Sequence, residues 1–158
     1  MASPPETLDD LLAVEAIKQL KAQYFLFMDL KQWDSWRELF TDDVRIEGGP
    51  THESRDAFVD FVRRHLDGVQ TCHHGYMPII EVMTETTARG TWAMSDDLRF
   101  PSGHPWSADH ARQRGYGHYH EEYRRVAGRW RISSMRLSRL SLWSEPDARV
   151  DMTPQGSR

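Results

Sequence analysis

The stretch YFLFMDL, residues 24–30, closes the first long helical pattern of the chain. Apolar side chains three and four residues apart lead up to it from about Thr7, and this spacing predicts one face of an amphipathic helix. Every residue of the stretch is apolar or aromatic except Asp29. A buried carboxylate without a partner is strongly destabilising. The sequence therefore predicts either that Asp29 reaches solvent at the helix end or that another segment meets it.

The composition is that of a soluble globular protein with many aromatic side chains. Its 158 residues are enough for one domain with a sizeable core. Six Trp, five Tyr and six Phe supply large apolar surfaces for a core or for an apolar pocket. The net charge of −4 gives no reason to expect a nucleic-acid partner.

Neither the N-terminus nor any apolar run indicates export or a membrane. The first six residues lack the basic and apolar regions of a signal peptide, and no stretch approaches membrane-spanning length. Cys72 is the only cysteine, so no disulfide can form within the chain and a reducing compartment is the simplest assumption. We therefore expect a cytoplasmic protein without a membrane partner.

The order of the expected elements favours an α+β fold. Helices are expected at about 8–30, 35–40 and 54–66, and a first strand at 44–47 lies between the last two. From residue 70 the apolar period changes to two, which predicts further strands at about 70–76, 79–84, 87–98, 114–126 and 129–142. Helices followed by an antiparallel strand series are typical of α+β proteins. We expect a curved sheet that wraps around the helices and encloses a cone-shaped cavity.

A single domain is expected over residues 7–143. It would lie between a flexible lead, residues 1–6, and a polar C-terminal tail, residues 144–158. Within the domain, residues 100–113 contain two prolines and a glycine, which indicates a long loop or lid.

The candidate partner of Asp29 is a histidine in the run TCHHG, residues 71–75. Neighbouring residues of a strand point to opposite faces, so only one of His73 and His74 can enter a cavity. A carboxylate beside a neutral histidine fixes its tautomer and stabilises the imidazolium, which makes a general base. The residues alone leave the choice of histidine open, as well as the simpler arrangement of one solvent-facing and one core histidine.

The last predicted strand carries an arginine on its apolar face. Arg136 has the same parity as four apolar residues of the strand, which are Trp130, Ile132, Leu140 and Leu142. If residues 127–128 form a two-residue turn, Tyr123 pairs with Ile132 and Tyr119 pairs with Arg136. Tyr119 and Arg136 would then line the cavity together, and a core-facing arginine usually meets a carboxylate or an anionic group. The alternative is an arginine at a strand edge that reaches water.

Asp96 shares its parity with Trp92 and Met94, which places it on the inward face near the mouth of the cavity. It could hold Arg136, act on a substrate, or simply begin a turn. His118 and His120 share one strand face, as metal ligands can, but the spacing to a further ligand is wrong. No metal and no cofactor are therefore expected.

Several motifs together resemble the SnoaL-like branch of the NTF2-like superfamily, over about residues 8–142. They are WDSW at 33–36, LFTDD at 39–43, HHG at 73–75, ARGTWAM at 88–94 and GRWRI at 128–132. The resemblance implies a cone in which N-terminal helices pack in the concavity of a curved, mixed or antiparallel sheet. It also implies a homo-oligomer, either a trimer or a dimer.

The site pattern is similar to that of bile-acid 7α-dehydratase, with scytalone dehydratase and lindane dehydrochlorinase as more distant relatives. This similarity implies that the catalytic residues are Tyr24, Asp29, His73, Asp96 and Arg136, and it selects His73 over His74. The aromatic and apolar residues expected to contact the substrate are Met28, Phe58, Trp92, Met94, Trp106 and Tyr119.

The resemblance implies a cofactor-independent lyase, of the dehydratase type, that acts on a hydrophobic, ring-containing molecule such as a steroid or aromatic compound. His73 would remove a proton while Asp29 orients it. Tyr24 and Arg136 would stabilise developing negative charge, and Asp96 would hold Arg136 or assist at the leaving group. Alternatives are an isomerase, cyclase or C–C lyase with the same pocket, a non-catalytic ligand-binding or assembly module, and a structural small subunit.

Overall fold

The computed structural model describes residues 5–47, 52, 54–107 and 111–145. Its elements, in chain order, are α1 (Leu8–Asp29), α2 (Trp33–Arg37), β1 (Phe40–Glu47), α3 (Arg55–Leu66), β2 (Gln70–Thr84), β3 (Thr87–Arg99), β4 (Arg112–Val126) and β5 (Arg129–Glu145). Most of the predicted lead (1–6) and of the predicted tail (144–158) lies outside the described residues. Among the described helices, none is both long enough and apolar enough to cross a bilayer.

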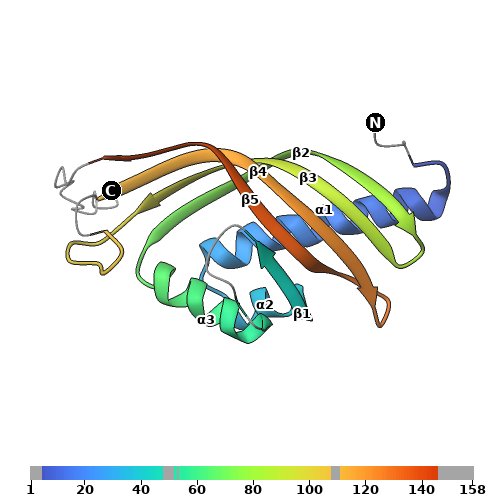
Figure 1. Cartoon of the computed structure of the whole chain (residues 1–158), viewed down its shortest axis with the longest axis horizontal. Coiled ribbons are helices and arrows are strands. Elements are labelled where there is room, and N and C mark those ends of the chain that lie inside the picture. Colours follow the sequence, from blue (N-terminus) through green and yellow to red (C-terminus); the bar gives the residue numbers. More distant parts are fainter. Residues whose placement is uncertain (1–4, 48–51, 53, 108–110, 146–158) are drawn as a thin grey trace, which may run out of the picture.

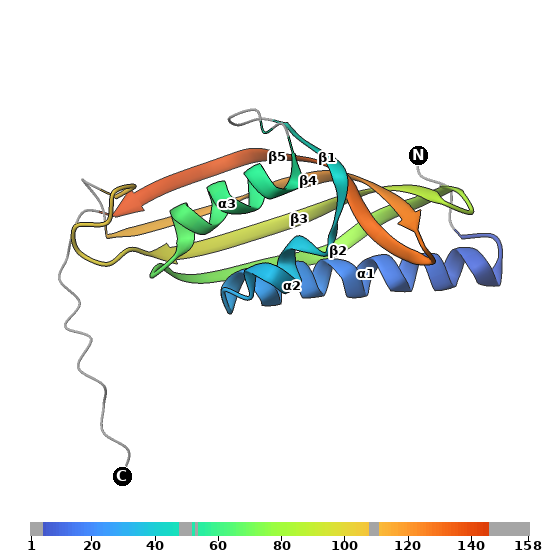
Figure 2. The ribbon, with the colours of Figure 1, turned by 90° about the horizontal axis from the view of Figure 1, so that it is seen from below.

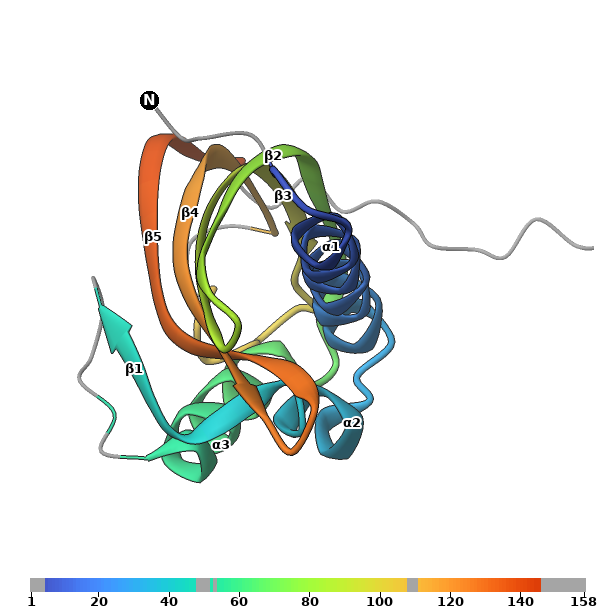
Figure 3. The ribbon, with the colours of Figure 1, turned by 90° about the vertical axis from the view of Figure 1, so that its right-hand side faces the viewer.

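The five strands form one mixed sheet in the order β1-β5-β4-β3-β2. β1 runs parallel to β5, and the other neighbours are antiparallel. The sheet is strongly curved, and the helices lie on its concave side (Figures 1 and 3). Helix α1 runs along the sheet beside the edge strand β2 (Figure 2). The predicted α+β class and NTF2-like cone, with helices in the concavity of the sheet, are confirmed.

Helix α1 begins as the sequence predicts. Thr7 caps it by accepting a hydrogen bond from the Asp10 backbone N–H, and the Asp10 carboxylate in turn accepts from the Thr7 backbone N–H. The buried face of α1 joins an aromatic cluster at the base of the cone, in which Tyr24, Trp36 and Phe40 pack with ring centroids 4.8–6.0 Å apart. The helix ends at Asp29, the residue that needs a partner.

Three predicted boundaries are wrong. The predicted strands 70–76 and 79–84 are one strand, β2, because the chain passes Gly75 and Pro78 through a bulge instead of leaving the sheet. The first strand begins at Phe40 rather than at residue 44, since Phe40 is fully buried and pairs with Ile132 of β5. The second helix is correspondingly shorter and ends at Arg37.

Strand β5 changes its register against β4 twice. Tyr123 pairs with Ile132, as predicted, but Glu122 then pairs with Ser134, so Ser133 is an extra residue. One extra residue reverses the alternation of side chains along a strand. From there the odd-numbered residues face inward, and Arg139 lies opposite Gly117. A second bulge, at Leu140, restores the first parity.

Gly117 is required by the second bulge. A Cβ at this position would lie 2.1 Å from the Ser138 carbonyl oxygen and 3.0 Å from Arg139 Cα, and backbone atoms cannot move aside cheaply. We expect Gly117→Ala to lower the free energy of unfolding by about 1–3 kcal/mol, measured by urea denaturation. Gly90→Ala, whose Cβ would lie 3.1 Å from the Tyr123 side chain and no closer than 3.5 Å to the Ile79 carbonyl oxygen, should cost less. An equal loss of stability in both variants would contradict the requirement for glycine at position 117.

Candidate active site

The partner of Asp29 is His73. Because α1 ends beside an edge strand, the Asp29 carboxylate meets the free backbone N–H of that strand. His73 N donates to Asp29 Oδ2 at 2.9 Å, and His73 Nδ1 lies 2.6 Å from Asp29 Oδ1. The His73 side chain is only 6% exposed, whereas the Asp29 side chain is 23% exposed. His74 is exposed and its ring lies beside Cys72 Sγ instead.

The charge state of Asp29 follows from its hydrogen bonds. Burial alone would raise the pKa of the Asp29 carboxyl, but hydrogen bonds from His73 and Thr71 outweigh burial, so this pKa lies below its ordinary value. An ionised carboxylate can only accept hydrogen bonds, so the His73 ring carries a proton on Nδ1, and in the neutral ring the lone pair is then on Nε2. Such an arrangement can serve as a general base with an orienting carboxylate.

The lowered pKa of Asp29 has a consequence for stability. A carboxyl whose pKa is depressed by folding stabilises the protein fully above its unfolded value, about 3.9, and less as the pH falls through the folded value. We therefore expect Asp29→Asn to be less stable than the parent at pH 7, where the parent carboxylate is ionised. The difference should shrink below about pH 4, as followed by urea denaturation. Asp60→Asn, on the exposed side of α3, is the matched control and should be as stable as the parent at pH 7.

Asp96 lies beside His73 because the two residues pair across β2 and β3. Its side chain is only 3% exposed and accepts two hydrogen bonds from Arg139, from Nη1 at 2.8 Å and from Nη2 at 2.5 Å. The predicted arginine was Arg136, and that prediction is wrong. Arg136 is exposed and pairs with His120 rather than with Tyr119, because the bulge at Ser133 reverses the strand parity.

A sequence signal for Arg139 lies on the neighbouring strand. Gly115 and Gly117 follow each other at alternate positions of β4 and leave the inner face without side chains there. A Cβ at Gly115 would lie 2.6 Å from Arg139 Nη1, so the arginine occupies the space that the glycine vacates. Glycines at alternate positions of a strand indicate the close approach of another group.

Tyr24 and Tyr119 lie next to this ion pair. Both are buried, and their ring centroids are 5.9 Å apart. Burial raises the pKa of Tyr24 well above its usual value, and the carboxylates of Glu121 and Asp96 add to this rise. Burial likewise raises the pKa of Tyr119. Both phenols are therefore protonated donors at neutral pH.

A buried ion pair below the two tyrosines was not predicted. Lys21 and Glu121 have fully buried side chains, with Nζ 2.5 Å from Oε1. Tyr123 donates to the other carboxylate oxygen of Glu121. Lys21 Nζ also lies 3.9 Å and 3.7 Å from the ring centroids of Tyr24 and Tyr119. The signal was present in the parity of β4, where Glu121 stands between two inward tyrosines.

The predicted substrate-contacting residues do not share one surface. Met94 lies two residues from Asp96 along β3, on the same face, and Met28 is buried near the end of α1. Trp92 is buried and donates to the Tyr123 hydroxyl at 2.8 Å. Phe58 packs in the core against Trp36 and Phe40, whereas Trp106 is 52% exposed and stacks on His65 of α3. The predicted lid is described up to Ser107 and again from Ala111, and residues 108–110 lie outside the described part.

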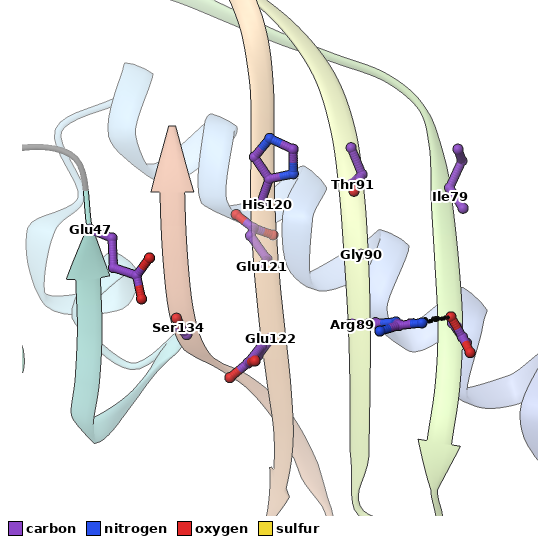
Figure 4. A pocket seen from close by; sticks show the side chains of 10 residues that line it. Glu47, Ile79, Arg89, Gly90, Thr91, His120, Glu121, Glu122 and Ser134 are labelled. Atoms are coloured by element: carbon purple, nitrogen blue, oxygen red, sulfur yellow. Dashed lines mark hydrogen bonds and ion pairs between the residues drawn. The ribbon is translucent and has the colours of Figure 1, made fainter. Parts of the chain in front are cut away.

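The sheet also has a hollow on its outer face, away from His73. It measures about 490 Å³ and is lined by side chains such as Glu47, Glu122 and His120 (Figure 4). A larger groove of about 1340 Å³ separates the start of α1 from the β4–β5 turn. Neither contains His73 or Asp29. Within the described residues, no three His, Cys, Asp or Glu side chains come together as metal ligands.

Solved structures share this fold at low sequence identity. A Novosphingobium aromaticivorans protein, provisionally named a scytalone dehydratase, matches with a TM-score of 0.76 and 20% identity over 88% of this chain and 91% of its own. A hexachlorocyclohexane dehydrochlorinase of Novosphingobium barchaimii matches with a TM-score of 0.73 and 20% identity, covering 93% and 98%. A Mycobacterium tuberculosis protein of unknown function matches with a TM-score of 0.71 and 23% identity, covering 93% and 83%. In sequence, the model of the SnoaL-like domain matches residues 9–136, which is most of the chain, and the protein therefore belongs to the SnoaL-like family.

Proposed function

We propose that the protein is a lyase that eliminates water or a similar leaving group from a hydrophobic, ring-containing small molecule, with His73 as the general base. The observation that supports this most is the contact of 2.6 Å between His73 Nδ1 and Asp29 Oδ1. Within the described residues His73 Nε2 makes no hydrogen bond, so it is available to a substrate proton. Two of the structural neighbours bear the names of elimination enzymes, a dehydratase and a dehydrochlorinase, which supports elimination.

The surrounding groups suit the two halves of an elimination. His73 Nε2 takes a proton from a carbon activated by a neighbouring carbonyl or ring, and the freed electron pair forms the new double bond. The hydroxyl leaves with a proton from Tyr24, which regains one from the imidazolium of His73. Arg139, in place of the predicted Arg136, stabilises the negative charge that develops on the carbonyl oxygen. Asp96 holds Arg139 in position.

The charges of the site favour an uncharged substrate. Asp96 is paired with Arg139 and Lys21 with Glu121, and Asp29 is bound to His73 and Thr71. No buried charge in this group is left to meet an ionic substrate, while Phe25 and the two tyrosines offer aromatic surface. A ring compound with a carbonyl and a hydroxyl fits both features.

The proposal is tested by screening uncharged cyclic β-hydroxy ketones, hydroxylated steroids and chlorinated cyclohexanes. Mass spectrometry should show the loss of water or HCl with the parent protein and no loss with Asp29→Asn. The same screen in D₂O separates a lyase from an isomerase. An isomerase incorporates deuterium into its product without the loss of water or HCl. Binding of these compounds without conversion would instead support the non-catalytic module.

A further inference from the structure

Thr71 connects Lys31 to the Asp29–His73 pair. Lys31 Nζ donates to Thr71 Oγ1 at 2.7 Å, and Thr71 Oγ1 donates to Asp29 Oδ1 at 2.8 Å. An ammonium group can only donate, so the Thr71 oxygen accepts from Lys31 and turns its own proton toward Asp29. Lys31 therefore orients the Thr71 hydroxyl as a hydrogen-bond donor to the Asp29 carboxylate.

Asp29 receives three donors as a result. These are the Thr71 hydroxyl, the His73 backbone N–H and His73 Nδ1. Together they fix both oxygens of the carboxylate in place. A carboxylate held in this way keeps the proton of the imidazole on Nδ1 and leaves Nε2 free. The orientation of the base thus depends on groups beyond Asp29 itself.

The backbone of Lys31 is unusual. Its φ of 58° lies in the left-handed region, which only one other non-glycine residue among those described adopts, Ala127 with φ 49°. Glycine or asparagine is the usual residue just after a helix in this conformation. The side chain of Lys31 also donates to the Met28 carbonyl at 3.2 Å, so capping of α1 is a rival explanation for the lysine.

Charged and titratable groups lie around the pair on several elements. Asp96 of β3 is paired with His73 and binds Arg139 of β5, and Tyr24 of α1 and Tyr119 of β4 interact electrostatically with Asp96. Arg139 is bound by Asp96, so Lys31 is the cation linked to Asp29 through hydrogen bonds. Burial lowers the pKa of Lys31, while Asp29 and Asp67 oppose this change.

We propose that Lys31 is a positioning residue of the Asp29–His73 pair, which acts through Thr71 to hold the carboxylate and to keep His73 Nε2 free. Its meaning for catalysis rests on the proposed function. The orientation and the charge effect can be measured without a substrate, so the two proposals can fail separately.

Lys31→Gly is the informative variant, because glycine suits the left-handed backbone and the fold is retained. Tm should rise by about 2–4 °C. Loss of the nearby positive charge favours the imidazolium, so the His73 ring should titrate about 0.5–1 pH unit higher, as followed by NMR of the ring carbons and assigned with His73→Gln. With a substrate in hand, kcat should fall roughly threefold to tenfold with KM unchanged.

Matched variants separate positioning from capping and from strain. Lys31→Arg keeps the positive charge, so the His73 ring should titrate in this variant as it does in the parent. Ala127→Gly relieves the same kind of strain far from the site and should raise Tm without moving the His73 titration. Thr71→Val breaks the link to Asp29 and should lower kcat as Lys31→Gly does, whereas Thr71→Ser should not.

An unchanged His73 titration in Lys31→Gly would overturn the proposal and leave helix capping as the role of Lys31. The same shift in Ala127→Gly would also overturn it. A shift in both Lys31→Gly and Thr71→Val, of which the second keeps the lysine charge, supports the positioning role even if the screened compounds are not converted, in which case only the proposed lyase activity fails. A shift in Lys31→Gly without one in Thr71→Val is an effect of charge alone and would overturn the proposal.

Discussion

Replacement of His73 by alanine is expected to lower kcat by about 10²- to 10⁴-fold, the usual contribution of a positioned general base. The reason is that the imidazole has its Nδ1 occupied by Asp29, and Nε2 has no hydrogen-bond partner within the described residues. KM should change little, because a base contributes mainly in the transition state. The measurement is kcat and KM on whichever compound of the screen is converted, with circular dichroism to establish that the variant is folded.

His74→Ala is the matched control for this result. His74 follows His73 in the chain but is exposed and turned to the other face of β2. The parent kcat should therefore be retained in His74→Ala. If turnover survives in His73→Ala or disappears in His74→Ala, the assignment of the base is wrong.

Local rules were sufficient to bring Asp29 together with one of the two histidines at 73 and 74. Helical spacing placed Asp29 at the end of an apolar helix, and the alternation of a strand required one histidine of the pair to point inward. Both rules concern neighbouring residues, and both hold where the backbone is regular. The choice of His73 over His74 needed the family resemblance, because parity alone does not say which face of β2 is covered by α1.

Strand β5 is not regular, and the prediction for Arg136 is wrong because it assumed strict alternation of side chains along this strand. The bulge at Ser133 depends on how β5 fits both β4 and β1, and its own residues give no local sign of it. Parity counted from Ile132 therefore selected the wrong arginine. The glycines at 115 and 117 carried the missing information, but they lie on another strand and become meaningful only once the register is known.

Removal of the Lys21 side chain charge is expected to have the largest effect on stability. Lys21→Met would leave the fully buried Glu121 carboxylate with Tyr123 as its remaining partner, and breaking such a pair typically costs about 3–5 kcal/mol. Urea denaturation measures this loss. Arg89→Met breaks an ion pair with Glu81 on the outer face, where the arginine is 62% exposed, and should cost no more than about 1 kcal/mol.

The double variant Lys21→Met/Glu121→Gln tests whether the stability lost in Lys21→Met is due to the Glu121 carboxylate that is left without its cation. It removes both charges, and the glutamine can still accept the hydrogen bond from Tyr123. Replacing a buried ion pair by neutral groups of similar volume is often close to neutral, because the cost of taking both charges out of water disappears. We therefore expect the double variant to recover most of the stability lost in Lys21→Met. If it stays as unstable as the single variant, the contact of the Lys21 ammonium with the Tyr24 and Tyr119 rings, rather than its pairing with Glu121, stabilises this part of the core.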